Sequence, residues 1–263
     1  MQTGNKTALI TGASAGIGET FARFLAKKGF NLVLVARRVD KLEALAKRLM
    51  EDHAIQCDSI AADLSDPGAV KQLMLELKKR ELQIDFLVNN AGMSGSYHFA
   101  EVPWSELAAE IQVMITALTE LAHAVAPGMK TRGYGRIVNV SSIAAYAPPA
   151  ASLLYTGIKG YVLSVSQSMD MELKPFGVNV TALCPGFTRT EFHDVMGTRD
   201  SANKIPDFMW QESLAVVQEC YEAVSKGKPI CVPGWVNKVT VASLRPVPDA
   251  VRYFLGSRLN PFK

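Results

Sequence analysis

Two side chains of complementary acid–base character, Tyr155 and Lys159, stand four residues apart in a segment whose apolar pattern predicts a helix. Residues four apart share one face of a helix, so the phenol and the ammonium should be neighbours. A free tyrosine has a pKa of about 10, and a nearby positive charge favours its phenolate. The pair indicates proton-transfer chemistry, although a tyrosine and a lysine at this spacing are common by chance.

A glycine-rich turn directly follows the first apolar segment, Thr7-Ala8-Leu9-Ile10. Glycine lets the chain turn sharply and approach a phosphate, and the helix that follows offers free N–H groups and the positive end of its dipole. The glycines are spaced GxxxGxG rather than in the commoner GxGxxG pattern. Because the turn opens a strand-to-helix pattern, it predicts a dinucleotide site made by Gly12, Ser14, Ala15, Gly16, Ile17 and Gly18.

The end of the second predicted strand indicates which dinucleotide is bound. An NAD site usually places an acidic residue about 20 positions after the glycines, where it holds the ribose hydroxyls. Here Ala36 takes that place, followed by Arg37 and Arg38. A guanidinium can pair with a 2′-phosphate that a carboxylate would repel, which favours NADP(H) with Arg37 as the phosphate ligand. We interpret Arg38 as a solvated residue at a helix start, and NAD stays the alternative if Arg37 is only a surface residue.

Short apolar segments alternate with amphipathic ones along the chain. Segments rich in Val, Ile and Leu predict strands at 7–10, 31–35, 84–88, 136–140 and 178–183, a weaker one at 54–61 and a last one at 229–232. Helical periodicity marks about 16–28, 40–52, 67–81, 104–130 and 153–174. The alternation predicts an α/β fold, a doubly wound parallel sheet of about seven strands of the Rossmann type, with helices on both faces.

No linker or low-complexity segment interrupts this alternation, so we expect a single domain over residues 1–263. Residues 187–228 differ, because they mix aromatic with polar residues and predict a loop-rich, partly helical insertion. In the tail from 234 to 263, Pro246, Pro248 and Pro261 argue against long helices.

Composition excludes several classes of protein. With 263 residues and 48% hydrophobic residues the chain can bury a sizeable core, and its net charge of +3, without clustered Lys and Arg, indicates no nucleic-acid partner. Four cysteines show neither CxxC pairs nor ligand spacing with the four histidines, so we expect no disulfide framework and no metal site. We find no signal-peptide pattern and no membrane-spanning apolar stretch, and expect a cytoplasmic protein without a membrane partner.

Five motifs in a fixed order resemble the short-chain dehydrogenase/reductase family, in its single-domain branch, over about residues 5–235. Besides the glycine-rich turn, they are Asp63-Leu64, Asn89-Asn90-Ala91-Gly92, Ser142 with Tyr155 and Lys159, and Pro185-Gly186. Ser142 stands 13 residues before Tyr155, the interval usual in the family, which favours it over Ser141.

The resemblance implies an oxidoreductase that moves a hydride between a nicotinamide and a carbonyl or alcohol. It implies that Tyr155 is the acid/base, that Ser142 holds the substrate oxygen, and that Lys159 lowers the tyrosine pKa and binds the nicotinamide ribose. By the same resemblance, other residues would border the adenine (Asp63, Leu64), the ribose (Asn90, Ala91, Gly92) and the nicotinamide (Pro185, Gly186, Thr188).

The resemblance also implies that residues 187–228 form a lid over the substrate. Its apolar side chains favour an apolar carbonyl or alcohol substrate; they are Phe187, Phe192, Phe208, Met209 and Trp210. Relatives commonly pair through the helices that correspond to 104–130 and 153–174, so a homodimer or homotetramer is expected.

One family feature is missing from the chain. The family usually carries an asparagine 13 residues before the proline that matches Pro127, and Met114 stands there instead. A thioether cannot donate a hydrogen bond to the water that this asparagine is thought to hold. Besides an active NADP-dependent enzyme, the sequence therefore leaves open a dinucleotide-binding sensor or scaffold with weak catalysis.

Overall fold

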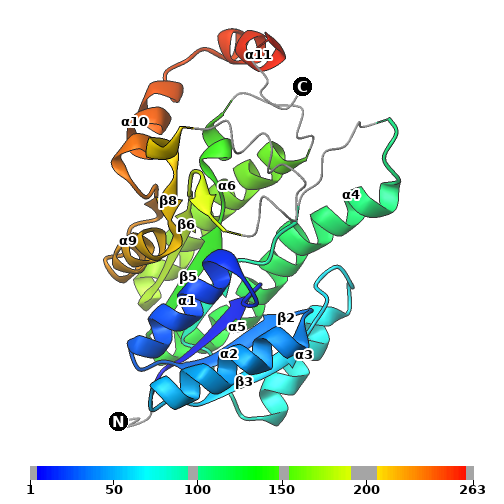
Figure 1. The fold of residues 1–263 in the computed structure, drawn as a ribbon, viewed down its shortest axis with the longest axis vertical. Helices are drawn as coiled ribbons and strands as arrows, with labels where there is room; N and C mark the ends of the chain where they lie inside the picture. Colours follow the sequence, from blue (N-terminus) through cyan, green and yellow to red (C-terminus); the bar gives the residue numbers. More distant parts are fainter. Residues whose placement is uncertain (1–4, 94–99, 148–153, 191–205, 259–263) are drawn as a thin grey trace.

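A parallel sheet forms the centre of the computed structural model, which describes residues 5–93, 100–147, 154–190 and 206–258 (Figure 1). Within these residues the sheet has seven strands in the order β3-β2-β1-β4-β5-β6-β9. Their bounds are β1 (Thr7–Thr11), β2 (Asn31–Ala36), β3 (Cys57–Ala61), β4 (Phe86–Asn89), β5 (Gly135–Val140), β6 (Val178–Leu183) and β9 (Ile230–Cys231). The predicted doubly wound, Rossmann-type sheet is confirmed.

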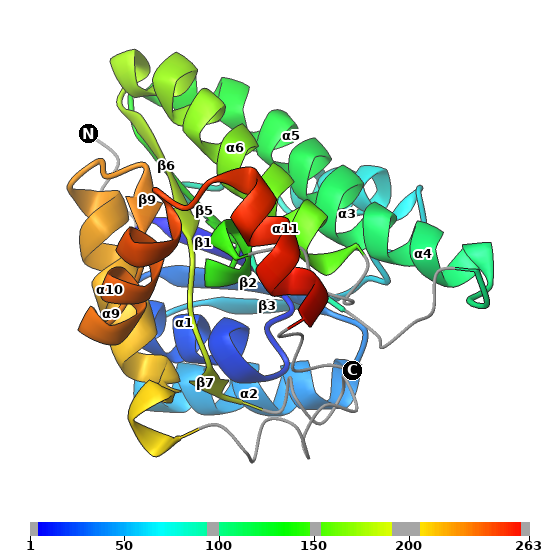
Figure 2. The same ribbon diagram turned by 90° about the horizontal axis from the view of Figure 1, so that it is seen from above.

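Helices cover both faces of the sheet (Figures 1 and 2). One face packs against α1 (Gly16–Lys27), α2 (Val39–Asp52) and α9 (Ser213–Ser225). The other packs against α3 (Ala69–Lys79), α6 (Tyr155–Leu173) and a continuous helix made of α4 (Trp104–Ile111), the π-helical segment η1 (Gln112–Ala117) and α5 (Leu118–Arg132). Three 3-10 turns, η2 (Ile143–Tyr146), η3 (Lys174–Phe176) and η4 (Asp207–Met209), complete the connections.

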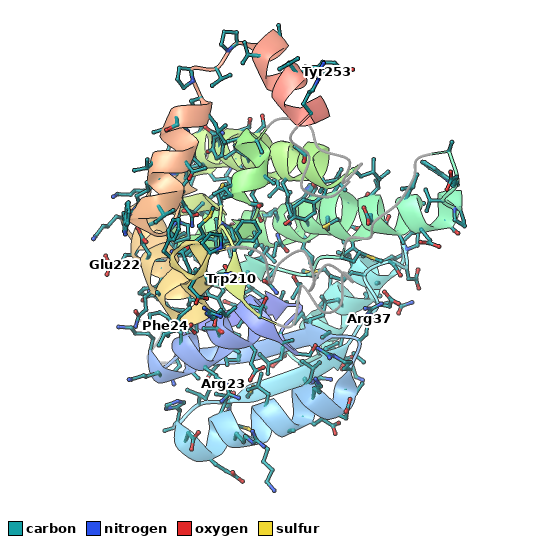
Figure 3. The ribbon with its side chains drawn as sticks, turned by 45° about the horizontal axis from the view of Figure 1, so that its top comes forward. Arg23, Phe24, Arg37, Trp210, Glu222 and Tyr253 are labelled. Atoms are coloured by element: carbon teal, nitrogen blue, oxygen red, sulfur yellow. The ribbon has the colours of Figure 1, made fainter. Side chains whose placement is uncertain are left out.

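Strand residues are apolar on both faces because both faces are buried. In β1, Leu9 belongs to the core under α3, α5 and α6, while Ala8 and Ile10 belong to the core under α1, α2 and α9. The second core includes a contact between helices far apart in sequence: Phe24 of α1 meets Tyr221 of α9 edge-on, with ring centroids 5.2 Å apart (Figure 3). Burial on two faces thus explains the unbroken apolar runs.

The chain after β6 differs in part from the sequence-based expectation. A two-stranded parallel ribbon, β7 (Thr188–Arg189) with β8 (Gln211–Glu212), precedes α9, and α9 packs on the sheet. The tail forms two helices of ten residues each, α10 (Trp235–Leu244) and α11 (Asp249–Arg258), which are shorter than the average helix of about 11–12 residues and agree with the expectation of no long helices there. Pro246 and Pro248 stand between these helices and separate them without preventing them. Phe192 and Pro261 lie outside the described residues.

The strand order reverses direction between β1 and β4, where the chain leaves the sheet on opposite faces. In open α/β sheets such a point leaves a crevice at the carboxyl ends of the strands, where ligands bind. Among the described residues, no helix is long and apolar enough to cross a bilayer.

Candidate active site

A cleft of about 350 Å³ opens at the carboxyl ends of the strands. Of the residues predicted for catalysis and cofactor binding, all but Gly18 line it. Its walls come from the turn after β1 and from the chain segments that follow the other central strands. Motifs far apart in sequence therefore meet in one place.

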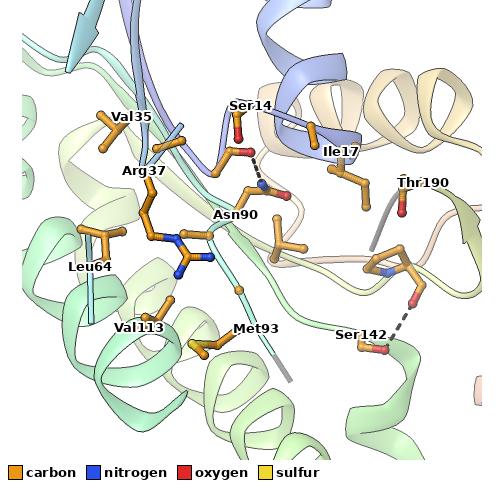
Figure 4. Close-up of a pocket in the computed structure, with 18 of the residues that line it drawn as sticks. Ser14, Ile17, Val35, Arg37, Leu64, Asn90, Met93, Val113, Ser142 and Thr190 are labelled. Atoms are coloured by element: carbon orange, nitrogen blue, oxygen red, sulfur yellow. Dashed lines mark hydrogen bonds between the residues drawn. The ribbon is translucent and has the colours of Figure 1, made fainter. Parts of the chain in front are cut away.

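The glycine-rich turn is held by the segment after β4. The hydroxyl of Thr11 accepts hydrogen bonds from the backbone N–H groups of Asn90 and Ala91, at 3.0 Å each. The side-chain amide of Asn90, labelled in Figure 4, donates back to the carbonyls of Thr11 and Gly12, at 3.1 and 3.2 Å. The Asn90 side chain thus fixes the turn, which no feature of the sequence motif revealed.

Two glycines of the turn adopt the left-handed backbone conformation, with φ of 65° at Gly12 and 58° at Gly16. Gly18 has a different task, because a Cβ there would lie 2.3 Å from the carbonyl oxygen of Gly12. Gly18 lets α1 pack closely on the turn, and α1 then directs its N-terminal N–H groups and dipole toward the cleft.

Both arginines after β2 border the cleft. Arg37 extends its guanidinium across the opening toward the side of Val113 and Met93 (Figure 4). Arg38, which we interpreted as a solvated residue, donates to the hydroxyl of Ser14 through Nη2 at 3.1 Å and Nε at 3.3 Å. The glycine-rich turn and the end of β2 thus present two guanidinium groups and a hydroxyl together.

Asp63 lies beside these cations, and its carboxylate already accepts hydrogen bonds from Ser65. The hydroxyl and backbone N–H of Ser65 donate to Asp63 Oδ1, at 2.8 and 3.0 Å. These two hydrogen bonds are the main cause that lowers the pKa of Asp63, and the charge of Arg37 adds a smaller effect. The predicted adenine-side residues Asp63 and Leu64 both line the cleft.

Ser142, Tyr155 and Lys159 meet at the opposite end of the cleft. Burial raises the pKa of Tyr155, and a hydrogen bond with Ser142 acts in the opposite direction. The Lys159 ammonium lies 5.4 Å from the centre of the Tyr155 ring and donates to the carbonyl oxygen of Val140 at 2.9 Å. Burial lowers the pKa of Lys159 to about 8.

The expected lowering of the tyrosine pKa by Lys159 is not found. Tyr155 keeps part of its surface open to the cleft, yet the loss of water around its hydroxyl outweighs the favourable contacts. Lys159 meanwhile directs its ammonium to a backbone carbonyl. With a raised pKa, Tyr155 is protonated at neutral pH, which is the form that can give a proton to a carbonyl oxygen.

The two neighbouring serines have different surroundings. Ser141 is buried and its hydroxyl donates to the backbone carbonyl of Lys159 at 2.7 Å, so it fastens α6 to the end of β5. The Ser142 hydroxyl accepts from the N–H of Ala144 at 3.1 Å and makes a long contact of 3.5 Å to the carbonyl of Pro185 (Figure 4). Ser142 is therefore the serine whose hydroxyl can turn to a ligand.

Met114 stands in the π-helical segment, one residue after Val113, which lines the cleft. Its side chain is fully buried, and its sulfur lies 3.5 Å from the place where a Cβ on Gly92 would be. The position that holds a polar amide in the resembled family therefore carries an apolar contact against the Asn-Asn-Ala-Gly segment.

Sequence reasoning missed several residues of the cleft wall. Most are apolar or small and sit one or two positions from a motif residue: Val35, Ala36, Arg38, Ala62, Met93, Val113, Val140, Ser141 and Thr190. Proximity to a strand end was the available signal for most of them. Val113 stands next to Met114 in the π-helical segment, and Thr190 stands two positions after Thr188.

The donor set fits a dinucleotide. One end of the cleft has the helix N-terminus and the two guanidinium groups, which suit phosphates. The same cleft is also lined by apolar and small residues such as Leu64, Val113 and Ala91, which suit flat rings and sugars. These features together define a nucleotide-dependent oxidoreductase of the doubly wound α/β class.

Comparisons with known proteins agree. The family model described as short chain dehydrogenase matches residues 6–200. An uncharacterized oxidoreductase of Staphylococcus saprophyticus is 34% identical over 186 residues, 71% of this chain and 80% of that protein. Oxidoreductase UcpA of Salmonella typhimurium is 36% identical over 187 residues, 70% of each chain.

Solved structures extend the likeness over almost the whole chain. A short-chain dehydrogenase from Sphingobium yanoikuyae in complex with NADPH has a TM-score of 0.81 and 34% identity, covering 96% of each chain. The bulky-bulky ketone specific alcohol dehydrogenase from Comamonas testosteroni has a TM-score of 0.77 and 30% identity, covering 94% of this chain and 97% of that one. The chain belongs to the short-chain dehydrogenase/reductase family and is an oxidoreductase.

Proposed function

We propose that this protein is an NADP(H)-dependent reductase of apolar carbonyl compounds, or in reverse a dehydrogenase of the alcohols, with Tyr155 as its acid/base. The observation that carries the proposal is one cleft with phosphate-binding groups at one end and Ser142, Tyr155 and Lys159 at the other. The binding of NADPH by the Sphingobium yanoikuyae relative supports the choice of cofactor.

Arg37 and Arg38 would hold the 2′-phosphate. Two guanidinium groups at the end of β2 provide charge-assisted donors, and Ser14, which Arg38 already contacts, adds a hydroxyl. The N-terminus of α1 would hold the pyrophosphate, and Asp63 and Leu64 would border the adenine. NADH lacks the 2′-phosphate and would not make these charge-assisted contacts.

Bound NADPH would supply the hydride for the carbonyl carbon of the substrate. Ser142 would donate a hydrogen bond to the substrate oxygen, where negative charge develops. Tyr155 would give its proton to that oxygen, a kind of help worth about 10²–10⁴ in rate. Lys159 would stabilise the tyrosinate left behind and bind the nicotinamide ribose once its ammonium turns from Val140 toward the cleft.

The substrate class is argued from the chain that follows Pro185. Phe187 and Trp210 contact each other, with ring centroids 5.8 Å apart, and the Phe208 side chain is 69% exposed. Such apolar surface beside the cleft favours an apolar ketone or aldehyde. The Comamonas testosteroni relative, which is specific for ketones with two bulky groups, supports this class. The lid over residues 187–228 stays a prediction, restricted by α9, which packs on the sheet.

Titration of the protein's intrinsic fluorescence with NADPH and with NADH tests the cofactor. NADPH should bind more tightly by at least tenfold, the equivalent of about 1.4 kcal/mol. Equal affinities would favour the NAD-dependent alternative and make Arg37 a surface residue.

Turnover separates an enzyme from a nucleotide sensor. The chain should oxidise NADPH in the presence of a panel of aryl and alkyl ketones and aldehydes. Tight NADPH binding without turnover on any of them would favour the sensor or scaffold, the hypothesis that Met114 supports.

Assembly and location remain predictions as well. A homodimer or homotetramer would use α5 and α6, and light scattering on the purified protein measures its mass directly. The expected cytoplasmic location can be tested by cell fractionation.

A further inference from the structure

Asn237 of α10 is a buried amide that lies behind Gly186, a residue of the cleft wall. Its side chain is 3% exposed. Its amide nitrogen donates to the carbonyl oxygen of Pro233 at 2.9 Å and to the side-chain oxygen Oε1 of Gln211 at 2.6 Å. Both donors of the amide are thus used, and they fix its position.

The amide presses against the backbone of Gly186. A Cβ on Gly186 would lie 2.3 Å from Oδ1 of Asn237 and 2.7 Å from Nδ2. Only a residue without a side chain fits between the cleft and Asn237. The glycine of the Pro-Gly motif is therefore explained by this contact, and the amide forms the wall behind the 185–188 backbone.

Gln211, the partner of Asn237, also contacts the 185–188 backbone directly. The N–H of Gln211 donates to the carbonyl of Phe187 at 2.9 Å, and Gln211 pairs with Thr188 in the β7–β8 ribbon. Thr188, which lines the cleft, in turn donates its hydroxyl to the carbonyl of Gly186 at 3.1 Å. Asn237, Gln211 and the 185–188 segment form one connected unit.

The unit is anchored in the body of the protein. Glu219 of α9 accepts from the N–H of Gly234 at 2.8 Å and forms an ion pair with Lys238 of α10. The helix that carries Asn237 is therefore tied to a helix whose inner face packs on the sheet. Trp210, next to Gln211 in sequence, lies on the same side of the molecule as α9 and α10 (Figure 3).

We propose that Asn237 is a positioning residue that, together with Gln211, holds the 185–188 backbone in register for the nicotinamide end of the cofactor. The inference rests on the proposed function, in which Pro185, Gly186 and Thr188 meet the nicotinamide. Asn237 touches no reacting atom; it acts through the backbone of Gly186. Through this contact, α10 supports the active site although it contributes no residue to the cleft wall.

The test compares two ligands that share the adenine half. NADPH reaches both ends of the cleft, whereas adenosine 2′,5′-bisphosphate reaches only the end with Arg37 and Arg38. In Asn237→Ala the dissociation constant for NADPH should rise about tenfold, the size expected when a buried hydrogen bond is lost, and that for the bisphosphate should stay unchanged. The KM for NADPH should rise with it.

Two further variants keep the test decisive. Ser243→Ala removes an exposed hydroxyl of the same helix, which donates to the carbonyl of Val239, and should leave both affinities unchanged. Gln211→Ala breaks the same hydrogen bond from the other side and should reproduce the loss for NADPH alone; it decides the question if Asn237→Ala does not fold.

The inference is overturned if Asn237→Ala and Gln211→Ala bind NADPH as tightly as wild type does. It is also overturned if these two variants, while still folded, lose affinity for NADPH and for the bisphosphate in parallel. Failure of wild type itself to bind NADPH would contradict the proposed function, and the inference would fall with it. The two failures are distinguished by the wild-type titration.

Discussion

Lys159 keeps its ammonium in a buried place where its pKa falls to about 8, so its charge depends on pH in the working range. Below that pKa the ammonium can stabilise the tyrosinate that forms as Tyr155 gives up its proton. Above it the lysine is neutral and this stabilisation is lost. We therefore predict that kcat/KM for carbonyl reduction is constant below about pH 7 and falls above about pH 8.

A pH–rate profile measured with saturating NADPH and limiting ketone checks this prediction. A rate that rises from pH 7 to pH 9 would show that the charge of Lys159 does not assist the reduction. Binding of NADPH measured over the same range provides the control, because it separates loss of binding from loss of proton transfer.

Arg37 is predicted to discriminate between the two cofactors. In Arg37→Ala the dissociation constant for NADPH should rise about 10- to 100-fold, since charge-assisted hydrogen bonds are worth about 1.5–3 kcal/mol. That for NADH should change less than about twofold, because NADH offers no 2′-phosphate. Lys41→Ala, an exposed cation on α2 that is not part of the cleft wall, serves as the matched control. Equal losses for both cofactors would contradict the assigned role.

At the scale of elements, α6 is positioned by both of its ends. Ser141 holds the backbone of Lys159 near the start of the helix, and Asp170 near its end accepts the N–H of Val180 at 2.9 Å. Asp170 is 5% exposed and also contacts Lys174. Because Tyr155 and Lys159 lie on this helix, these two hydrogen bonds also fix the position of the proposed catalytic pair.

Asp170→Ala should lower the free energy of unfolding by about 1–3 kcal/mol, because it leaves the buried N–H of Val180 without a partner. Denaturant unfolding measures this change. Asp58→Ala removes a partly exposed ion pair with Arg80, at 2.8 Å, and should cost no more than about 1 kcal/mol. Comparable losses in the two variants would show that the Asp170 contact adds nothing beyond a surface ion pair.

Elements of regular pattern could be predicted from sequence, and irregular ones could not. The strands were visible because burial on both faces makes them rich in apolar residues, as in β2. The π-helical segment at 112–117 has no such signature, since its residues look like ordinary helix. Pro246 and Pro248 stand between α10 and α11 and keep the two helices short, as the sequence indicated.

Across the whole molecule, features set by local sequence could be predicted, whereas contacts between distant segments could not. Most motif residues could be found because they stand at strand ends, which the sheet order brings together, while Tyr155 and Lys159 share one face of α6. Side-chain contacts between distant segments left no trace in sequence: the Asn237–Gln211 hydrogen bond and the turn of Arg38 toward Ser14 are examples. Asparagine and arginine at such positions have no periodicity that could reveal a partner.

The central claim is that Tyr155 transfers the proton while a phosphate-binding end of the same cleft holds NADPH. Reduction of an apolar ketone by wild type and by Tyr155→Phe, each saturated with NADPH, tests it most directly. The account predicts that the variant binds NADPH within about twofold of wild type and loses about 10²–10⁴ in kcat. A variant that reduces the ketone as fast as wild type would contradict it.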